Sequence, residues 1–473
     1  MRETGKNILE EIVASRQKNK TALQSRSNRE RVLGNRITVP FGRQPFVICE
    51  IKRASPSKGD FAAGIDPVVQ AGIYKDAGIQ NVSVLTEPDY FKGDLRFITR
   101  IKERYPELSL LRKDFLLDTE DIEDSYRSGA DAVLLIASIL SDRTIQEMYT
   151  RTKELGMRAL VEVHDKTDID KVRRFKPDLV GINSRNLKNF SIDLLHPLRV
   201  KKFLTWNPAI ILESGIKGAY GGRFAVSENF SGVLVGESVM RNPGLIPKII
   251  SGLNGSAEND FWTKLTGKMK IREIPLVKVC GLTNRADVSA AEDFGADLLG
   301  FIVAPSPRKA GGAFIRSLPQ TRGLKAAVTV CRDGKPEAEA VELLRQGYVD
   351  CLQIHGDLKD DLTGIYPYYS SVQVRSPSDT QIPPDYEPPR ILLDTFAADK
   401  AGGTGKRIPE KFLTGVSGKP LWIAGGINHA NVDEIIRNYK PELIDVSSGL
   451  ELEPGKKDMI KMKKFFKEIR RSR

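Results

Sequence analysis

Short apolar runs recur along the whole chain, and longer stretches with helical spacing of apolar residues lie between them. Buried strands that alternate with helices are typical of a parallel sheet. The first half predicts strands near residues 46–51, 81–85, 108–112, 132–136, 158–163, 179–183, 209–213 and 232–236. The second half predicts strands near residues 276–280, 298–303, 325–330, 349–354, 370–375, 390–394, 420–424 and 443–447. The pattern therefore predicts an α/β protein with two consecutive (β/α)8 TIM barrels, which fits 473 residues at about 250 per barrel.

Turn-forming residues interrupt this alternation after residue 250. We expect a first domain at residues 1–252, a linker with a short helical piece at 253–274, and a second domain at 275–473. An amphipathic helix that is extra to a minimal barrel is predicted at the start, with an apolar stripe of Ile8, Leu9, Ile12 and Val13. The basic last segment is interpreted as a closing helix rather than a membrane or nucleic-acid helix, because helical spacing joins Met459, Met462, Phe466 and Ile469.

Polar residues gather at the predicted carboxyl ends of strands in the first half. Glu50 and Lys52 are two positions apart, so both face the same side of the first strand. From this spacing alone, a surface salt bridge before a turn is an equal alternative. The ends of later strands carry Lys113, Glu162, Asn183, Arg185 and Glu213. Since active sites of such barrels form at the carboxyl ends of the strands, the set predicts a catalytic site there.

The second half places a thiol and a carboxylate at matching strand ends. Cys280 closes its first strand and Asp394 closes its sixth. The alternatives are an inert buried cysteine and a strand-end cap. If both side chains meet at one rim, they can serve as base and acid.

Glycine-containing loops follow the seventh and eighth strands of both halves, at Gly215 and Gly236 and at Gly426 and Gly449. Loops at these positions often bind phosphate through backbone N–H groups. Each half is therefore expected to hold its own phosphorylated ligand.

Composition narrows the classes of function. The net charge of +12 suits either nucleic acid or phosphorylated substrates, but the basic residues are dispersed and aromatic residues make up only 7%. We therefore expect small phosphorylated substrates and no nucleic-acid partner. No apolar run approaches the ~20 residues that span a bilayer, and the first residues lack a signal-peptide core, so a cytoplasmic protein without a membrane partner is expected. The four cysteines form no CxxC pair, so a disulfide framework or a zinc site is not expected. We expect no metal and no cofactor.

Two motifs resemble known families. The sequence EIKRASPSKG at residues 50–59 closely resembles the first strand and loop of the indole-3-glycerol-phosphate synthase family. The sequence KVCGLT at residues 278–283 resembles the phosphoribosylanthranilate isomerase family. Together the resemblances cover nearly the whole chain, in the order of fused two-domain enzymes of tryptophan biosynthesis. They imply a second half that isomerises N-(5-phosphoribosyl)anthranilate, and a first half that cyclises and decarboxylates the resulting carboxyphenylamino-deoxyribulose phosphate to indole-3-glycerol phosphate. We expect a monomer.

The resemblance also implies roles for individual residues. Lys113 would be the general acid of the synthase, with Glu162 as its acid/base partner in dehydration, and Lys52 would grip the substrate carboxylate. Cys280 would be the base of the isomerase and Asp394 its acid. The substrate-binding set that the resemblance implies is Glu50, Ser55, Phe115, Leu134, Asn183, Arg185, Leu187, Glu213, Ser214, Gly215, Gly236, Arg308, Gly425, Gly426, Ser447 and Ser448.

Two alternative functions were considered, and the sequence argues against both. A sugar-phosphate isomerase of the kind found in histidine biosynthesis uses, by family analogy, paired aspartates at strands one and five, and neither first strand here ends in aspartate. A basic nucleic-acid-binding scaffold on inactive barrels would not need the acid and base sets. His355 has no obvious partner in the sequence and is expected to be structural.

Overall fold

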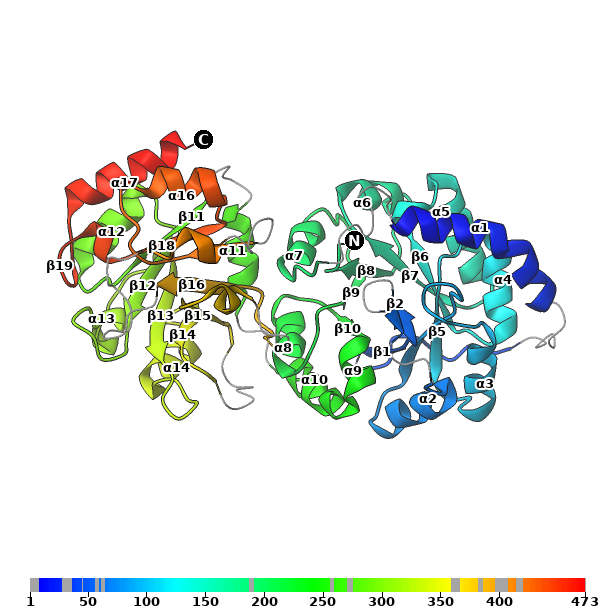
Figure 1. The fold of residues 1–473 in the computed structure, drawn as a ribbon. Coiled ribbons are helices and arrows are strands. Elements are labelled where there is room, and N and C mark those ends of the chain that lie inside the picture. Colours follow the sequence, from blue (N-terminus) through cyan, green and yellow to red (C-terminus); the bar gives the residue numbers. More distant parts are fainter. Residues whose placement is uncertain are drawn as a thin grey trace. The chain divides into compact units, whose positions relative to one another are not determined.

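The computed structural model describes residues 8–27, 36–44, 46–55, 59–60, 64–186, 191–255, 259–269, 275–358, 366–381, 386–395, 407–413 and 420–472. It divides into two compact units, Met1–Ala257 and Glu258–Arg473. Figure 1 shows a ring of strands surrounded by helices in each unit. None of the described helices combines the length and the apolar content needed to cross a membrane.

The first unit contains a closed parallel barrel whose strands follow chain order. Its strands are β1 (Val47–Ile51), β4 (Asn81–Leu85), β5 (Ser109–Lys113), β6 (Ala132–Ile136), β7 (Arg158–Val163), β8 (Leu179–Asn183), β9 (Ala209–Glu213) and β10 (Gly232–Val235). Its helices are α1 (Ile8–Ser27), α2 (Pro67–Asp76), α3 (Arg96–Arg104), α4 (Thr119–Ser128), α5 (Asp142–Glu154), α6 (Lys166–Val172), α7 (Leu195–Lys201), α8 (Ala219–Ser227), α9 (Glu237–Arg241) and α10 (Ile246–Leu253).

The second unit repeats this plan. Its barrel strands are β11 (Leu276–Cys280), β12 (Leu298–Ile302), β13 (Leu324–Val330), β14 (Cys351–His355), β15 (Tyr368–Val374), β16 (Ile391–Thr395), β17 (Trp422–Ile423) and β18 (Leu443–Val446). Its helices are α11 (Phe261–Met269), α12 (Arg285–Phe294), α13 (Gly312–Arg316), α14 (Ala338–Arg345), α15 (Glu410–Leu413), α16 (Val432–Tyr439) and α17 (Met459–Arg471). The prediction of two consecutive (β/α)8 barrels is confirmed, and each predicted strand ends within two residues of its observed bounds.

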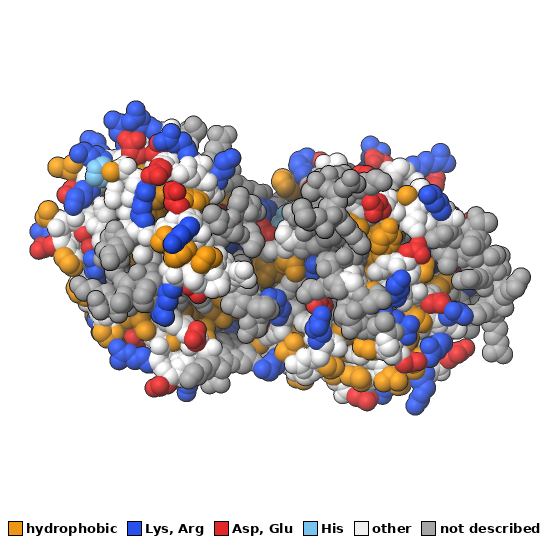
Figure 2. Space-filling view, in the orientation of Figure 1, with side chains coloured by type: hydrophobic (Ala, Val, Ile, Leu, Met, Phe, Trp, Pro, Cys, Tyr) orange, Lys and Arg blue, Asp and Glu red, His pale blue; other side chains and the backbone are white. Residues whose placement is uncertain are grey.

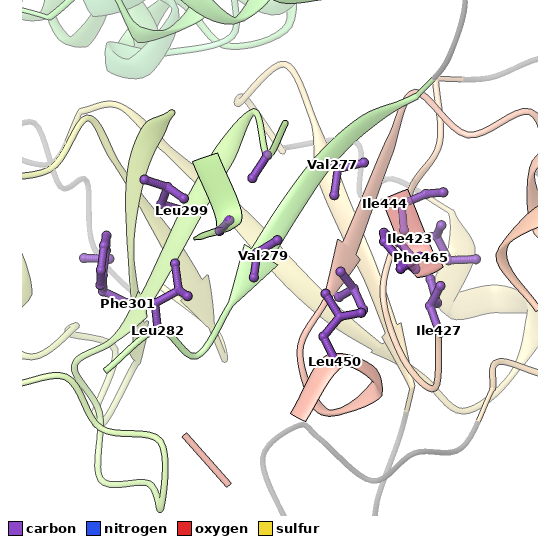
Figure 3. Close-up of a cluster of buried hydrophobic side chains, with 14 of the residues drawn as sticks. Val277, Val279, Leu282, Leu299, Phe301, Ile423, Ile427, Ile444, Leu450 and Phe465 are labelled. Atoms are coloured by element: carbon purple, nitrogen blue, oxygen red, sulfur yellow. The ribbon is translucent and has the colours of Figure 1, made fainter. Parts of the chain in front are cut away.

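The strands are buried on both faces, which explains why they appear in the sequence as continuous apolar runs. In the second unit one cluster joins strand residues to the surrounding helices, including Val277, Ile444 and Phe465 (Figure 3). The side chains that face the helices hold the barrel closed. The polar residues at the strand ends are thereby fixed on a rigid frame.

The closing helix α17 packs through Met462, Phe465, Phe466 and Ile469. The prediction that Met459 joins this face is wrong, because Met459 is the first residue of the helix and is 40% exposed. Phe465 takes its place in the core.

Part of the segment expected to be a linker packs as a helix on the second barrel. In α11, Phe261, Trp262 and Leu265 are fully buried. The ring of Trp262 lies 6.2 Å from that of Trp422 in β17. These buried aromatic rings make α11 part of the second unit.

We therefore predict that Trp262→Ala destabilises the second unit by about 3–5 kcal/mol, the usual cost of removing a buried tryptophan. In calorimetry the unfolding transition of that unit should fall by at least about 6 °C. Trp206→Ala is the control, because Trp206 lies half-buried in the first unit and should leave this transition in place. An unchanged transition in Trp262→Ala would show that α11 contributes nothing to the second barrel.

Candidate active sites

In the first barrel, an ammonium group lies among carboxylates at the carboxyl ends of the strands. Lys113 Nζ lies 3.4 Å from Glu213 Oε2 and 3.6 Å from Glu50 Oε2. The other oxygen of Glu50 contacts Lys52 Nζ at 2.8 Å. The residues come from β1, β5 and β9, so closure of the barrel is what brings them together. Glu50 and Lys52 therefore form a partly buried pair within this cluster and not a surface salt bridge.

Glu162 extends the cluster from β7. It is 3% exposed, and its Oε1 accepts a hydrogen bond from Asn183 Nδ2 at 3.3 Å. Asn183 Oδ1 in turn accepts from the backbone N–H of Arg185 at 3.0 Å. These contacts fix the Glu162 carboxylate and the start of the loop after β8.

Burial and neighbouring charges oppose each other at these groups. Burial alone would lower the pKa of Lys113, but the carboxylates of Glu213, Glu50 and Glu162 outweigh it and raise that pKa above its usual value. Burial alone would raise the pKa of Glu50, but Lys52 and Lys113 hold it below the usual value. Burial and then Glu162 raise the pKa of Glu213. At neutral pH the site therefore keeps Lys113 charged and supplies a proton donor surrounded by acceptors.

Two glycines leave room for these carboxylates. A Cβ on Gly181 of β8 would lie 2.0 Å from Glu213 Oε1. A Cβ on Gly236 would lie 2.6 Å from Glu50 Oε1 and 3.3 Å from Lys52 Nζ. The requirement for glycine at these positions follows from the close approach of the acidic side chains.

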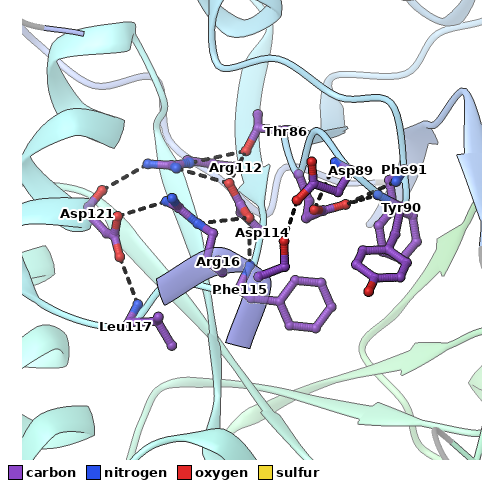
Figure 4. A network of polar contacts seen from close by, with 12 residues as sticks. Arg16, Thr86, Asp89, Tyr90, Phe91, Arg112, Asp114, Phe115, Leu117 and Asp121 are labelled. Carbon is purple, nitrogen blue, oxygen red and sulfur yellow. Dashed lines mark hydrogen bonds and ion pairs between the residues drawn. The ribbon is translucent and has the colours of Figure 1, made fainter. Parts of the chain in front are cut away.

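The loop that follows Lys113 and β5 is anchored to the N-terminal helix (Figure 4). Arg16 of α1 is 5% exposed, and its guanidinium contacts Asp121 at 2.8 Å and Asp114 at 3.6 Å. Asp114 also contacts Arg112 at 3.0 Å. The extra helix predicted before the first strand thus reaches, through Asp114, the residue next to Lys113.

The apolar residues of the predicted set come from β6 and from the segment after β5. Leu134 is buried in a cluster against which Phe115 packs, and the ring of Phe115 lies 6.2 Å from that of Phe91. Ser55 is half-buried in β2 (Ala54–Ser55), directly after β1. Leu187 lies outside the described residues.

In the second barrel, Cys280 lies beside a buried ion pair. Lys278 is fully buried in β11, and its Nζ contacts Asp445 Oδ2 of β18 at 2.6 Å. Burial raises the pKa of the Cys280 thiol, and Lys278, which also hydrogen-bonds to the thiol, acts to lower it. On balance the pKa of the thiol is raised, and Lys278 is the neighbouring cation that would stabilise a thiolate.

Asp394 faces the same ion pair from β16. Burial raises its pKa to about 6, and Asp445 and Lys278 act on it in opposite directions. Its Oδ1 accepts from the backbone N–H of Thr395 at 2.7 Å. Lys278 and Asp445 thus influence the pKa of both Cys280, the predicted base, and Asp394, the predicted acid.

The buried pair continues into a polar chain inside the barrel. Lys278 donates to Gln353, which also accepts from Tyr369 Oη at 3.1 Å. Gln353 Nε2 lies 3.0 Å from His355 Nε2. His355 thus has a partner, although none is obvious in the sequence, and burial lowers its pKa to about 4.

The hairpin of β19 (Glu451–Glu453) and β20 (Lys456–Lys457), which precedes α17, contacts Cys280. Lys457 donates to the Cys280 carbonyl at 2.6 Å and to Glu451 Oε1 at 3.0 Å. Arg308 Nη2 contacts Glu451 Oε2 at 2.9 Å. The predicted binding residue Arg308 is therefore held beside the first strand of this barrel by a glutamate from its last loop.

The predicted phosphate loops meet in pairs. In the first barrel Ser238 Oγ donates to the Ile216 carbonyl at 2.8 Å, and in the second a Cβ on Gly449 would lie 1.9 Å from the Ile427 carbonyl. Ser214 and Gly215 both adopt left-handed backbone, with φ of 67° and 82°. Gly425 and Gly426 do the same, with φ of 94° and 61°. Glycine, which lacks a Cβ, lets the backbone approach a ligand closely at such turns.

Ser447 and Ser448 follow β18 at this rim. The Ser447 hydroxyl is buried, and it makes no hydrogen bond within the described part of the chain. It is therefore available to a ligand. No group of three or more His, Cys, Asp or Glu side chains suited to a metal ion occurs among the described residues.

Sequence reasoning missed several ionisable groups of these sites. They are Lys278, Glu451 and Lys457 in the second barrel, Asp445 in its last strand, and His164 in the first barrel. Lys278 and Asp445 interrupt apolar strands in the same way as Glu162 does, so the same signal pointed to them. Lys457 had no such signal, because only the hairpin brings it to Cys280.

Comparisons with known proteins place both halves in families. The model of the family "Indole-3-glycerol phosphate synthase" matches residues 3–250, and that of "N-(5'phosphoribosyl)anthranilate (PRA) isomerase" matches residues 277–468.

Among curated relatives, a multifunctional tryptophan biosynthesis protein of Schizosaccharomyces pombe is 28% identical over 90% of this chain and 60% of its own length. A multifunctional tryptophan biosynthesis protein of Phycomyces blakesleeanus is 29% identical over 99% of this chain and 70% of its own length. An indole-3-glycerol phosphate synthase of Desulfotalea psychrophila is 40% identical over 41% of this chain and 75% of its own length. The chain thus spans 60–63% of the length of the first two multifunctional relatives it matches.

The raised pKa of Asp394 predicts a gain in stability when its charge is removed. Its carboxyl titrates near 6 in the folded chain against an ordinary 3.8, so its contribution to stability is complete below pH 3.8 and is lost as pH rises through 6. Asp394→Asn should therefore stabilise the second unit by up to about 3 kcal/mol at pH 8, and by about half as much at pH 5.

Urea unfolding of the second unit at both pH values measures this difference. Asp293→Asn is the matched control, because the side chain of Asp293 is 67% exposed and its removal should change little at either pH. An equal gain from Asp394→Asn at both pH values would mean that burial of the carboxylate is not the cause.

Proposed function

The chain belongs to the indole-3-glycerol phosphate synthase family and carries a PRA isomerase domain in its second half, and we propose that it catalyses two consecutive steps of tryptophan biosynthesis. The second barrel converts N-(5-phosphoribosyl)anthranilate to the carboxyphenylamino-deoxyribulose phosphate. The first barrel closes that product to indole-3-glycerol phosphate with loss of carbon dioxide and water. The observation that carries the proposal is Lys113, an ammonium held among carboxylates at the rim of the first barrel.

In the synthase step, ring closure requires a proton on the ketone oxygen. Lys113 supplies it, and the carboxylates that raise its pKa keep it protonated at neutral pH. Lys52 binds the substrate carboxylate, which leaves as carbon dioxide. Glu162 then acts as the acid/base group while the hydroxyl leaves as water and the ring becomes aromatic again.

The rest of the predicted set binds the substrate of this step. Glu50, Asn183 and Glu213 orient the reacting groups, and Arg185 lies at the loop they fix. Phe115 and Leu134 supply an apolar wall for the aromatic ring. The phosphate binds at the left-handed turn and the paired loop formed by Ser214, Gly215 and Gly236, together with Ser55.

In the isomerase step, Asp394 donates a proton to the ribose ring oxygen and the ring opens to a Schiff base. A carboxyl with a pKa near 6 retains a protonated fraction at neutral pH, which suits this role. The Cys280 thiolate removes the C2′ proton, and the resulting enol relaxes to the ketone. Lys278 stabilises the thiolate while Asp445 holds Lys278 in place.

The residues predicted to bind the phosphate in this second site are Gly425, Gly426, Ser447 and Ser448. The buried Ser447 hydroxyl, without a hydrogen bond among described residues, supports this assignment. Arg308 is positioned by Glu451 near the same rim.

The distribution of charge favours small anions over nucleic acid as partners. On the face shown in Figure 2, lysine and arginine side chains lie interspersed with acidic ones, with a denser group over α17. Nucleic-acid interfaces concentrate basic residues on one continuous face. We propose that the protein works as a cytoplasmic monomer without cofactor.

A coupled assay tests the two activities. Supplied with N-(5-phosphoribosyl)anthranilate, the full chain should consume the anthranilate-type fluorescence and generate indole absorbance. Lys113→Met should stop at the deoxyribulose product, with the synthase rate reduced by at least about 10²-fold. Cys280→Ser should block the first step by a similar factor, while added deoxyribulose phosphate is still cyclised.

Lys153→Met is the matched control, because this lysine lies on the outer helix α5 and its side chain is 49% exposed. Both activities should persist in it. Retention of synthase activity in Lys113→Met, or of isomerase activity in Cys280→Ser with Cys331 and Cys351 also replaced, would contradict the assigned roles.

A further inference from the structure

A histidine that sequence reasoning passed over touches the proposed acid/base group of the first barrel. His164 follows the end of β7 and lies two residues after Glu162, so both side chains point to the same side of the strand end. His164 Nε2 lies 3.3 Å from Glu162 Oε1. Of the two oxygens of Glu162, this is the one that also accepts from Asn183.

The other ring nitrogen faces a second carboxylate. His164 Nδ1 lies 3.9 Å from Asp168 Oδ2 in α6, and the same oxygen accepts the backbone N–H of His164 at 2.9 Å. The side chains thus form a row from the active site outward, in the order Glu162, His164 and Asp168. Asp168 is itself held by the turn that begins α6, where its backbone N–H donates to Asp165.

The ring of His164 makes no hydrogen bond to the described residues, although two carboxylates lie near it. Both ring nitrogens are buried, and neither makes a hydrogen bond within the part of the chain that the structure describes. Buried polar groups in proteins are almost always paired, so an unpaired imidazole between two carboxylates needs an explanation. An imidazole that passes a proton between Glu162 and Asp168 during turnover would explain this arrangement.

We propose that His164 is a positioning residue that exchanges the proton of Glu162 during the dehydration step, which rests on the synthase function proposed above. When Glu162 has taken a proton from the substrate, His164 Nε2 accepts it and Glu162 returns to carboxylate. The imidazolium then releases its other proton from Nδ1 toward Asp168. For reprotonation of Glu162 the same transfers run in reverse, so no proton is created or lost.

Ionisable groups from several elements surround the imidazole of His164. The ionisable groups that face this row are Glu162 from β7, Asp165, Asp168 and Lys171 from α6 and the turn before it, and His196 from α7. The groups nearest the two ring nitrogens are the carboxylates of Glu162 and Asp168. His196 Nε2 lies 2.8 Å from the His164 carbonyl and not from its ring, so it holds the backbone without competing for Glu162.

Steady-state kinetics of the full chain test this role, with the carboxyphenylamino-deoxyribulose phosphate as substrate and pH varied from about 5.5 to 9. In His164→Gln an amide remains near Glu162 but cannot titrate, and in His164→Leu no polar group remains. In both variants kcat should fall roughly 10- to 100-fold while KM changes by less than about threefold. The limb of the kcat profile that belongs to this pair should disappear or move by at least about one pH unit.

Chemical rescue gives a second readout that a structural role would not move. Added imidazole should restore part of kcat in His164→Ala and none in Lys113→Met. His196→Gln is the matched control, since it keeps a donor to the His164 carbonyl and should retain both kcat and pH profile. Melting of the first unit and the affinity for indole-3-glycerol phosphate show whether each variant is folded.

Two results would overturn the inference. One is a kcat within twofold of the unaltered chain and an unchanged pH profile in both His164→Gln and His164→Leu. The other is a normal kcat in His164→Gln with a reduced kcat in His164→Leu. That result would mean that His164 provides a hydrogen bond and does not exchange a proton. An unaltered chain without synthase activity would instead remove the proposed function itself, so the two failures are distinguishable.

Discussion

The candidate sites of both barrels depend on a lysine ammonium that is paired with carboxylates from strands distant in the sequence. In the first barrel Lys113 is held by Glu50 and Glu213, and in the second Lys278 is held by Asp445. A charge removed from water is tolerable only when it is paired, and removing one partner leaves the other uncompensated. The same pairing therefore makes both charges tolerable inside the barrel and influences the pKa of the groups around them.

In the first barrel, glycines without a Cβ leave space for the charged side chains. Gly181 and Gly236 occupy positions where a methyl group would collide with the carboxylates of the first site. Among the described residues, Asp394 has no cationic partner in direct contact, and burial raises its pKa to about 6. Such groups reduce the stability of the folded chain at neutral pH and are retained where activity needs them.

Segments outside the rings of strands complete each site. The helix α1 reaches the loop after β5 through Arg16, and the hairpin before α17 reaches Cys280 through Lys457. Each contact joins the rigid strand ends to a segment far away in the chain. The barrel supplies the positions of the reacting groups, and these segments fix the loops between them.

The sequence by itself determined the two barrels, because strands buried on both faces must be continuous apolar runs and the helices between them must be amphipathic. It also indicated Lys113, Glu162, Cys280 and Asp394, because a polar residue at the end of such a run is costly unless it is used or paired. Only the tertiary structure decided the pairs: Lys278 with Asp445, Lys457 with the Cys280 carbonyl, and His164 between Glu162 and Asp168. It also decided that α11 packs on the second barrel. These contacts join strand ends, loops and helices whose separation in the chain carries no signal, and they exist only once each ring of strands has closed.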